Sequence, residues 1–399
     1  MYDPISANVL PHYMTVRRLA SIGLTALLLG GIAIATVCCG DQEPATITSF
    51  DQAPEREWAW FPIEGMECAD GQPTGIGLSR GTSNNLVIYM AGGGACWDHQ
   101  SCYEQERASF IAEGFSVADF GDMSSELDGF ELFDRDASDN PARDWTFVFV
   151  PYCTGDLHAG TVVADYDGRT TRHVGRANVQ AMLDQIAPNL VGSGSESGAE
   201  PETETETESG TETESGTETE SGTERVVLTG SSAGGYGASF NYGLVADTFS
   251  NARVDMINDG GPPLPLPHAP AELMTTWITA WGLTATAPAG CQGCETDLSA
   301  YLTTHFDAHP QARFALLSYT EDGVISDYHG IDGSTMALGL ETMRVESFVP
   351  TSNARVFYKS GSGHTMATEM HDTLAGGTSA WSWVLAMLDD DPAWSDITP

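Results

Sequence analysis

The apolar positions of this chain fall into short continuous runs separated by longer amphipathic stretches. Six segments predict strands of the sheet, some of them continuous apolar runs and others only rich in apolar residues: 86–90, 145–150, 226–228, 253–258, 314–319 and 353–358. Apolar residues at helical spacing fill the intervals 172–190, 271–283, 298–309, 335–345 and 379–388. This alternation predicts one α/β domain with a doubly wound, mostly parallel sheet and helices on both faces.

One strand-to-helix junction carries the strongest chemical pattern. After the apolar run 226–228, residues 230–234 read GSSAG, which fits the G-x-S-x-G turn that raises a serine above a sheet. Small residues two positions on either side of Ser232 allow a sharp turn that exposes its hydroxyl. Ser232 is therefore the candidate nucleophile. The N–H of Ala233, at the start of the next helix, would face a developing oxyanion.

Two segments lack the apolar residues that a core requires. Residues 41–58 are polar and irregular, which indicates a tether before a domain at 59–399. Residues 192–224 repeat ETESGT with Glu as the only charged residue, a composition that predicts disorder. This insertion joins a helix to the next parallel strand, so we expect it at the amino edge of the sheet, away from catalysis. A spacer or a calcium-attracting segment is the functional alternative.

The N-terminal 40 residues predict export. Arg17 and Arg18 precede the apolar stretch 19–37, and Met14 is the expected start of translation. The adjacent Cys38 and Cys39 resemble the lipid-attachment site of a bacterial lipoprotein, and an uncleaved anchor is the alternative. The protein is expected in the bacterial cell envelope or secreted, and at a membrane only through this segment.

Charge restricts the partners. The 399 residues contain 56 acidic and 16 basic side chains, which gives a formal net charge of -40. Repulsion from a polyanion argues against nucleic acid, and an acidic polymer would need a local basic patch that no run of residues provides.

The cysteines fit an oxidising compartment better than a metal site. Cys291 and Cys294 are two residues apart with no second pair nearby, so a disulfide or a strained redox pair is the better interpretation than a metal site. No metal and no cofactor are expected.

A serine nucleophile needs a base, and the base needs an acid that orients it. His364 follows the last strand in the sequence GSGH and is the candidate base. Asp322 stands just after the strand 314–319, with Glu321, Asp327 and Asp332 close by in the sequence, and it is the candidate acid. Asp259 ends the preceding strand and competes for this role, although a turn-forming Asp before two glycines is the simpler interpretation.

The glycine-rich sequence after the first strong strand predicts the second half of an oxyanion hole. Lipases and esterases take a backbone N–H from such a loop, and Gly94 and Ala95 are the candidates here. Asp156 and His158 of TGDLHAG could line the site, but a polar turn is the simpler interpretation.

Together the motifs resemble the pectin acetylesterase family, which includes the Notum carboxylesterases. The similar segments, in the family's order, are CADG at 68, AGGGAC at 91, VPYCTGD at 150, GSSAGG at 230, NDGG at 258 and GSGH at 361. The resemblance implies an α/β-hydrolase-like fold and a triad of Ser232, Asp322 and His364. It also implies disulfides around the glycine-rich loop, for which Cys96 and Cys102 are candidates by nearness.

The resemblance further implies an esterase that removes O-acetyl groups from a polysaccharide, with an acylated carbohydrate or another ester as substrate. Two alternatives remain: removal of a longer acyl chain, as by Notum, and a non-catalytic surface binding protein on a hydrolase scaffold. The family usually has an aromatic residue after its glycines, where this chain has Ala95, with Trp97 two positions on. The shape of the acyl pocket is therefore not predicted.

Overall fold

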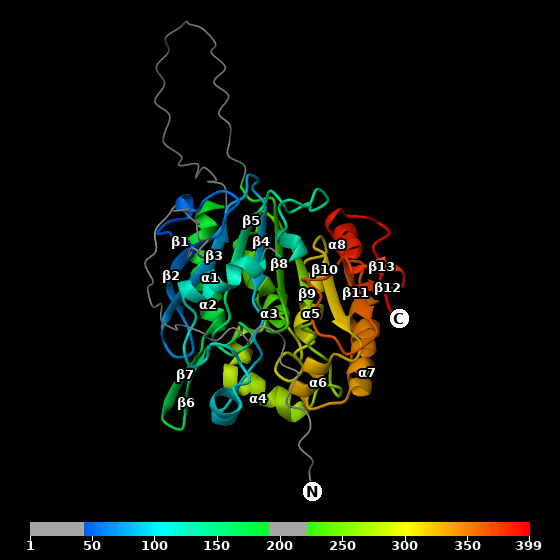
Figure 1. Cartoon of the computed structure of the whole chain (residues 1–399). Coiled ribbons are helices and arrows are strands. Elements are labelled where there is room, and N and C mark those ends of the chain that lie inside the picture. Colours follow the sequence, from blue (N-terminus) through cyan, green and yellow to red (C-terminus); the bar gives the residue numbers. More distant parts are fainter. Residues whose placement is uncertain (1–43, 128, 191–221) are drawn as a thin grey trace, which may run out of the picture. The chain divides into compact units, whose positions relative to one another are not determined.

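The computed structural model describes residues 44–127, 129–190 and 222–399 (Figure 1). Within them one sheet has nine strands in the order β1-β2-β3-β5-β4-β8-β9-β10-β11. Its strands are β1 (Ala45–Thr46), β2 (Ala59–Glu67), β3 (Pro73–Ser79), β4 (Leu86–Met90), β5 (Thr146–Val150), β8 (Arg225–Ser231), β9 (Arg253–Asp259), β10 (Phe314–Tyr319) and β11 (Ala354–Lys359). The strands from β5 to β11 in this order are all parallel. The predicted mostly parallel α/β sheet is confirmed.

Helices cover both faces of this sheet. Met90, Phe314 and Tyr358 point to one face, where α3, α5 and α7 contact them. Phe149 and Phe357 point to the opposite face and contact α1 and α8. The described α-helices are α1 (Val117–Leu127), α2 (Gly175–Ile186), α3 (Ala233–Thr248), α4 (Ala271–Trp281), α5 (Ala300–Ala308), α6 (Gly323–His329), α7 (Gly333–Met343) and α8 (Ala380–Leu388).

Several elements were not predicted from the sequence. β3 is antiparallel to both of its neighbours, β2 and β5, and with β2 and β1 it extends the sheet beyond β5. A separate hairpin is formed by β6 (Val162–Tyr166) and β7 (Arg169–His173), with Asp167 and Gly168 in its turn at φ 57° and 85°. A second small pair is β12 (Leu374–Ala375) with β13 (Thr378–Ser379). Asp-Gly between β-forming residues is a known hairpin signal, so the β6–β7 turn could have been found from the sequence.

The expected tether and insertion meet the domain in different ways. β1 pairs with β2, and Ile47, Phe50 and Ala53 are buried, so residues 45–53 pack against the domain instead of leaving it. The N–H of Thr223 donates to the carbonyl of Leu190 at 2.8 Å, so the described ends on either side of the insertion lie together.

The N-terminal 40 residues, with Met14, Cys38 and Cys39, lie outside the described residues, as does the part 192–221 of the predicted insertion 192–224. Along the described part of the chain, no helix combines the length and the apolar character needed to cross a bilayer.

Disulfides join three pairs of the described cysteines. Cys68 is bonded to Cys153, Cys96 to Cys102, and Cys291 to Cys294. The Cys96–Cys102 pairing that the family resemblance implied is confirmed, and Cys291 and Cys294 form a disulfide as expected.

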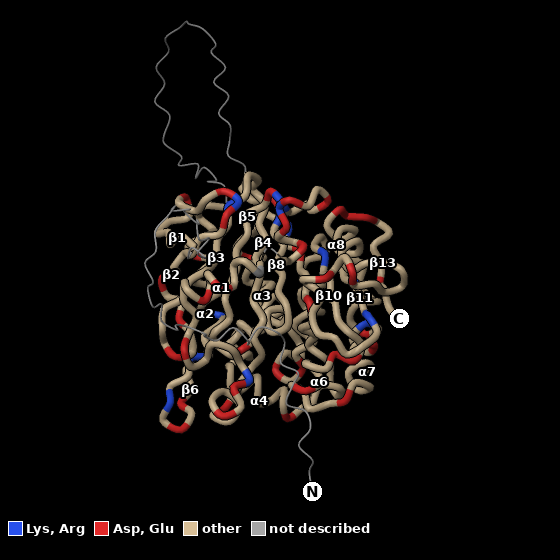
Figure 2. The backbone as a smooth tube through the Cα atoms, in the orientation of Figure 1, with Lys and Arg blue, Asp and Glu red and all other residues tan. Residues whose placement is uncertain are grey.

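Acidic side chains are spread over the loops of the domain, and basic ones occur at fewer places (Figure 2). One group of arginines lies at the amino end of the strands, where Arg225 and Arg253 form ion pairs with the buried Asp255 at 2.7 and 2.8 Å. These pairs satisfy a carboxylate inside β9, at the opposite end of that strand from Asp259.

Candidate active site

The junction between β8 and α3 has the geometry that the sequence predicts for a nucleophile elbow. Ser232 stands between the two elements at φ 58° and ψ -120°, a backbone conformation that residues other than glycine rarely adopt. The turn is closed so tightly that a Cβ at Gly234 would overlap the carbonyl oxygen of Met90, and one at Gly230 would overlap the backbone of Gly234. The chain therefore presents Ser232 from a strained turn that only glycines at 230 and 234 allow.

The candidate base and acid are in direct contact. The Nδ1 of His364 lies 2.8 Å from Oδ2 of Asp322, and both side chains are largely buried. A carboxylate can only accept, so Nδ1 carries the proton and Nε2 is the free proton acceptor. Asp322 is also the N-cap of α6, where its Oδ1 accepts from the N–H groups of Val324 and Ile325, both at 3.0 Å. The carboxylate is thus held on both of its oxygens.

Both groups that would exchange the reacting proton are without partners among the described residues. Nε2 of His364 is buried and forms no hydrogen bond there. The hydroxyl of Ser232 also forms none, whereas its backbone is engaged: its N–H donates to the carbonyl of Asp259 at 2.8 Å, and its carbonyl accepts from the N–H of Gly235 at 2.9 Å. In enzymes without bound substrate, catalytic hydrogen bonds are often formed only when the substrate arrives.

The other acids near Asp322 in the sequence have different partners. Asp327 pairs with Arg107 at 3.0 Å, and Asp332 caps α7 through the N–H of Thr335. Asp259 contacts the backbone after His364 instead of its ring, at the N–H groups of Met366 and Ala367. Of the candidates, Asp322 alone is hydrogen-bonded to the imidazole in the described structure.

The glycine-rich loop after β4 lies beside Ser232, but its two candidate donors differ. The N–H of Ala95 donates to the carbonyl of Arg107 at 3.1 Å, so it is not free for an oxyanion, contrary to the sequence-based expectation. The N–H groups of Gly94 and Ala233 have no acceptor within the described residues, and both residues line the cavity next to Ser232. Gly94 is held at φ 79°, where a Cβ would overlap the Arg107 carbonyl and the Tyr328 hydroxyl.

The cavity at Ser232 is small. It has a volume of about 20 Å³, little more than one water molecule needs. Its lining residues are Gly94, Ala95, Leu157, Ser232, Ala233, Tyr236, Trp277, Ile325, Tyr328 and His329. Burial lowers the pKa of His329 to about 4, so this side chain is neutral at pH 7 and the wall carries no formal charge there. The aromatic wall comes from α3, α4 and α6, and no motif in the sequence identified it.

A buried polar network that includes His158 and Asp156 contacts the backbone of the glycine-rich loop. His158 donates from Nε2 to the carbonyl of Ala91 at 2.8 Å, and burial lowers its pKa. Asp156 accepts from Thr154 Oγ1 at 2.6 Å and from the N–H of Gly175 at 2.7 Å. Neither His158 nor Asp156 is among the residues that line the cavity. They hold backbone in place, which agrees with the simpler interpretation of TGDLHAG.

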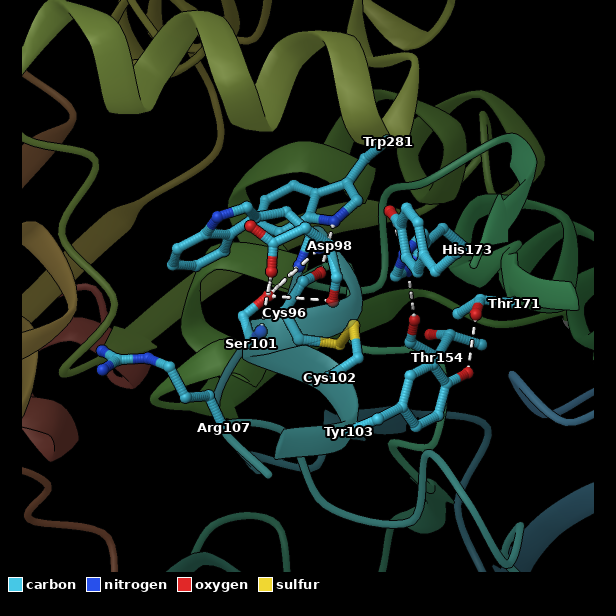
Figure 3. Close-up of a disulfide and its surroundings, with 12 residues drawn as sticks. Cys96, Asp98, Ser101, Cys102, Tyr103, Arg107, Thr154, Thr171, His173 and Trp281 are labelled. Carbon is cyan, nitrogen blue, oxygen red and sulfur yellow. Dashed lines mark hydrogen bonds between the residues drawn. A yellow bond between two sulfur atoms is a disulfide. The ribbon is translucent and has the colours of Figure 1, made fainter. Parts of the chain in front are cut away.

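The exit of the same loop is fixed by the Cys96–Cys102 disulfide (Figure 3). The indole N–H of Trp281 donates to the carbonyl of Cys96 at 2.9 Å, and Asp98 Oδ1 accepts from the hydroxyl of Ser101 at 2.7 Å. Since Cys96 follows Gly94 by two residues, these bonds restrict how far the candidate oxyanion donor can move.

Metal ligands are not grouped anywhere in the described residues: no three His, Cys, Asp or Glu side chains there are arranged to hold an ion.

The fold is that of an α/β-hydrolase-like protein, with an elbow serine after β8, an acid after β10 and a histidine loop after β11. The sequence model of the pectinacetylesterase family matches residues 61–195. Pectin acetylesterase 7 of Arabidopsis thaliana is 29% identical over 147 residues, which cover 34% of this chain and 36% of the relative. Pectin acetylesterase 4 of the same plant is 25% identical over 249 residues, 61% of this chain and 52% of the relative.

This chain is thus related to the pectin acetylesterase family, as its motifs predicted. The aligned parts span between about a third and half of the length of these curated relatives. The family match includes the glycine-rich loop with Gly94 but ends before Ser232.

Proposed function

We propose that this protein is an exported serine carboxylesterase that removes O-acetyl groups from a polysaccharide. The observation that carries the proposal is the Asp322–His364 hydrogen bond, which leaves Nε2 of a buried imidazole without a partner, in a loop that Asp259 links to the elbow of Ser232. Relatives named as pectin acetylesterases support the same class of reaction.

In the proposed reaction, Ser232 Oγ attacks the carbonyl carbon of the acetyl ester while His364 Nε2 takes the hydroxyl proton. Asp322 holds the imidazole in the tautomer with the proton on Nδ1 and stabilises the imidazolium. The N–H groups of Gly94 and Ala233 donate to the oxyanion of the tetrahedral intermediate.

Collapse of that intermediate breaks the ester bond, and His364 gives its proton to the departing sugar oxygen. A water molecule then loses a proton to Nε2 and attacks the acetyl-enzyme. The second tetrahedral intermediate that forms in this way collapses and releases acetate, and His364 returns the proton from Nε2 to the Ser232 oxygen.

Cavity size favours an acetyl group over a longer chain. The cavity next to Ser232 has a volume of about 20 Å³, and Ile325, Tyr328 and Trp277 are part of its wall, so a small acyl group is the better match to it. The three disulfides support export, because such bonds persist in oxidising compartments. A lipid on Cys38 or Cys39 stays a prediction, which the intact mass of the membrane-extracted protein would test.

The test compares the wild-type protein with Ser232→Ala on p-nitrophenyl acetate and p-nitrophenyl octanoate, followed by acetate release from acetylated pectin and acetylated xylan. Ser125→Ala, an exposed serine on α1, is the matched control. We expect Ser232→Ala to lose at least about 10³-fold in kcat on the acetate ester and Ser125→Ala to lose nothing.

A preference for octanoate would instead indicate a deacylase of longer chains. Equal turnover by wild type and Ser232→Ala would remove Ser232 as the nucleophile, and absence of turnover in both would favour a binding protein on this scaffold.

A further inference from the structure

Asp259 joins the two loops on which the proposed reaction depends. Its Oδ2 accepts from the hydroxyl of Ser231 at 2.8 Å, next to the nucleophile. The same carboxylate accepts from the N–H of Met366 at 2.9 Å and of Ala367 at 3.0 Å, directly after His364. Its backbone carbonyl accepts from the N–H of Ser232 at 2.8 Å. One residue thus contacts the backbone of the elbow, the side chain beside it and the histidine loop.

This carboxylate is buried without a cation in hydrogen-bond contact. Asp259 is 1% exposed, and the titratable groups whose charges reach it are His364 and Tyr319. Burial raises its pKa to about 6, against the opposing effects of Ser231, the two backbone N–H groups and His364. An ionised carboxylate in such a place is unfavourable for folding, so a packing role alone would be better filled by a neutral side chain.

The backbone after Asp259 explains why its partners come from distant parts of the chain. Gly260 donates its N–H to the carbonyl of Leu317, and Gly261 donates to Asn258 Oδ1. The next two residues are Pro262 and Pro263, which have no N–H. With no local donor left, the carboxylate is satisfied by the elbow and by the histidine loop.

We propose that Asp259 is a positioning residue for the reaction: its carboxylate fixes the histidine loop against the nucleophile elbow and so sets the approach of His364 to Ser232. The proposal rests on the proposed function, because it requires Ser232 and His364 to react together. Asp259 does not touch the imidazole in this structure; it acts through the backbone of Met366 and Ala367.

Replacing Asp259 by Asn tests this role. The amide keeps the size of the side chain but offers an NH₂ group where one carboxylate oxygen accepts, so at least one backbone N–H loses its acceptor. We expect kcat on p-nitrophenyl acetate to fall about 30-fold with KM changed less than about threefold, because a small displacement of a catalytic group slows the chemical step more than it weakens binding.

Asp255→Asn is the matched control. Asp255 is also fully buried on β9, but it lies at the opposite end of the strand and pairs with Arg225 and Arg253. This variant should lower the melting temperature and leave the kcat of the folded protein unchanged. Equal kcat losses in the two variants, once corrected for the folded fraction, would overturn the proposal, as would an Asp259→Asn enzyme within threefold of wild-type kcat.

The pH dependence of the reaction gives a second readout. If Asp259 must be ionised to hold the histidine loop, the ratio of wild-type to Asp259→Asn kcat/KM should be largest above about pH 6 and should fall towards 1 below it, because a protonated Asp259 resembles the amide. A ratio that does not change with pH contradicts the role of Asp259.

Ser232→Ala, measured in parallel, separates the two claims. Full activity in that variant would defeat the proposed function itself. Loss of activity there together with an unaffected Asp259→Asn enzyme would defeat only the positioning role.

Discussion

The neighbouring strands β9 and β10 each lead to a fully buried aspartate, yet the two carboxylates have different surroundings. Asp322, after β10, accepts from the first N–H groups of α6 and from the ring of His364. Asp259, at the end of β9, accepts from Ser231 and from the backbone that follows His364. One carboxylate faces the imidazole, and the other faces the loop that carries it.

The residues after each aspartate account for the difference. Asp322 is followed by Gly323, Val324 and Ile325, which begin a helix whose free N–H groups stabilise a negative charge. Asp259 is followed by two glycines whose N–H groups are used elsewhere and by two prolines. The N–H groups at the start of α6 bind only Oδ1 of Asp322, so its Oδ2 can accept from the imidazole of His364. Asp259 has no donor in the residues that follow it, and its carboxylate instead joins segments that are distant in the sequence.

The largest effect that separates the two aspartates is expected from Asp322→Asn. The amide of Asn would either place an NH₂ group against the N–H of His364 Nδ1 or favour the tautomer with the proton on Nε2. In both cases Nε2 is a poorer base, so kcat on p-nitrophenyl acetate should fall about 10³- to 10⁴-fold. Asn can still cap α6, so the melting temperature should change little. Steady-state kinetics beside Asp259→Asn check the order of the two effects; a larger loss in Asp259→Asn would reverse the roles assigned to the two strand ends.

How far the sequence predicted the fold depends on how local each signal is. The strands from β4 to β11 in the main sheet were found because apolar, β-forming residues are concentrated in each short segment, and the predicted interval 271–283 nearly coincides with α4. β2 and β3 were missed because glycines and a proline interrupt their apolar residues. α6 was missed because it is only seven residues long and follows its cap without a longer periodic pattern.

The candidate site was predictable to the extent that its residues stand in short motifs at strand ends. Ser232, His364 and Asp322 were found in this way, and the structure brings Asp322 and His364 into contact. The sequence could not exclude Ala95 as an oxyanion donor. Its N–H donates to the carbonyl of Arg107, which lies twelve residues later, and no local pattern indicates that contact. The role inferred for Asp259 depends on Met366 and Ala367, more than 100 residues later, so no local pattern could indicate it.

Ser231→Ala offers a smaller and sharper test of the Asp259 side of the comparison. It removes only the hydroxyl that links the elbow to the Asp259 carboxylate and leaves the bonds to Met366 and Ala367 in place. We expect kcat to fall about three- to tenfold, since one of several hydrogen bonds to a charged group is lost.

The matched control is Ser318→Ala on β10. Ser318 is also buried, near the end of β10, but its hydroxyl donates to the carbonyl of Tyr319 and not to a carboxylate. A kcat loss of the same size in both variants would mean that any buried hydroxyl at this edge of the sheet has the same effect. The catalytic contribution assigned to the Ser231–Asp259 hydrogen bond would then be refuted.

The smallest expected effect is on stability, and its sign follows from the pKa of Asp259. Burial raises this pKa from 3.8 to about 6, so the folded state binds the proton more tightly than the unfolded state does. The contribution of Asp259 to stability is therefore fully present below pH 3.8 and is lost as the pH rises through about 6, at a cost of about 3 kcal/mol.

Asp259→Asn lacks this titration, so its melting temperature relative to wild type should increase between pH 4.5 and pH 7.5, by several degrees for a domain of this size (~2 °C or more per kcal/mol). The hydrogen bond that Asn loses lowers its stability at every pH and does not change this trend. Thermal unfolding of both proteins at the two pH values measures it. A difference that stays constant with pH would mean that Asp259 is not a buried charge maintained at a cost to stability, and the contrast with Asp322 would then rest on hydrogen-bond geometry alone.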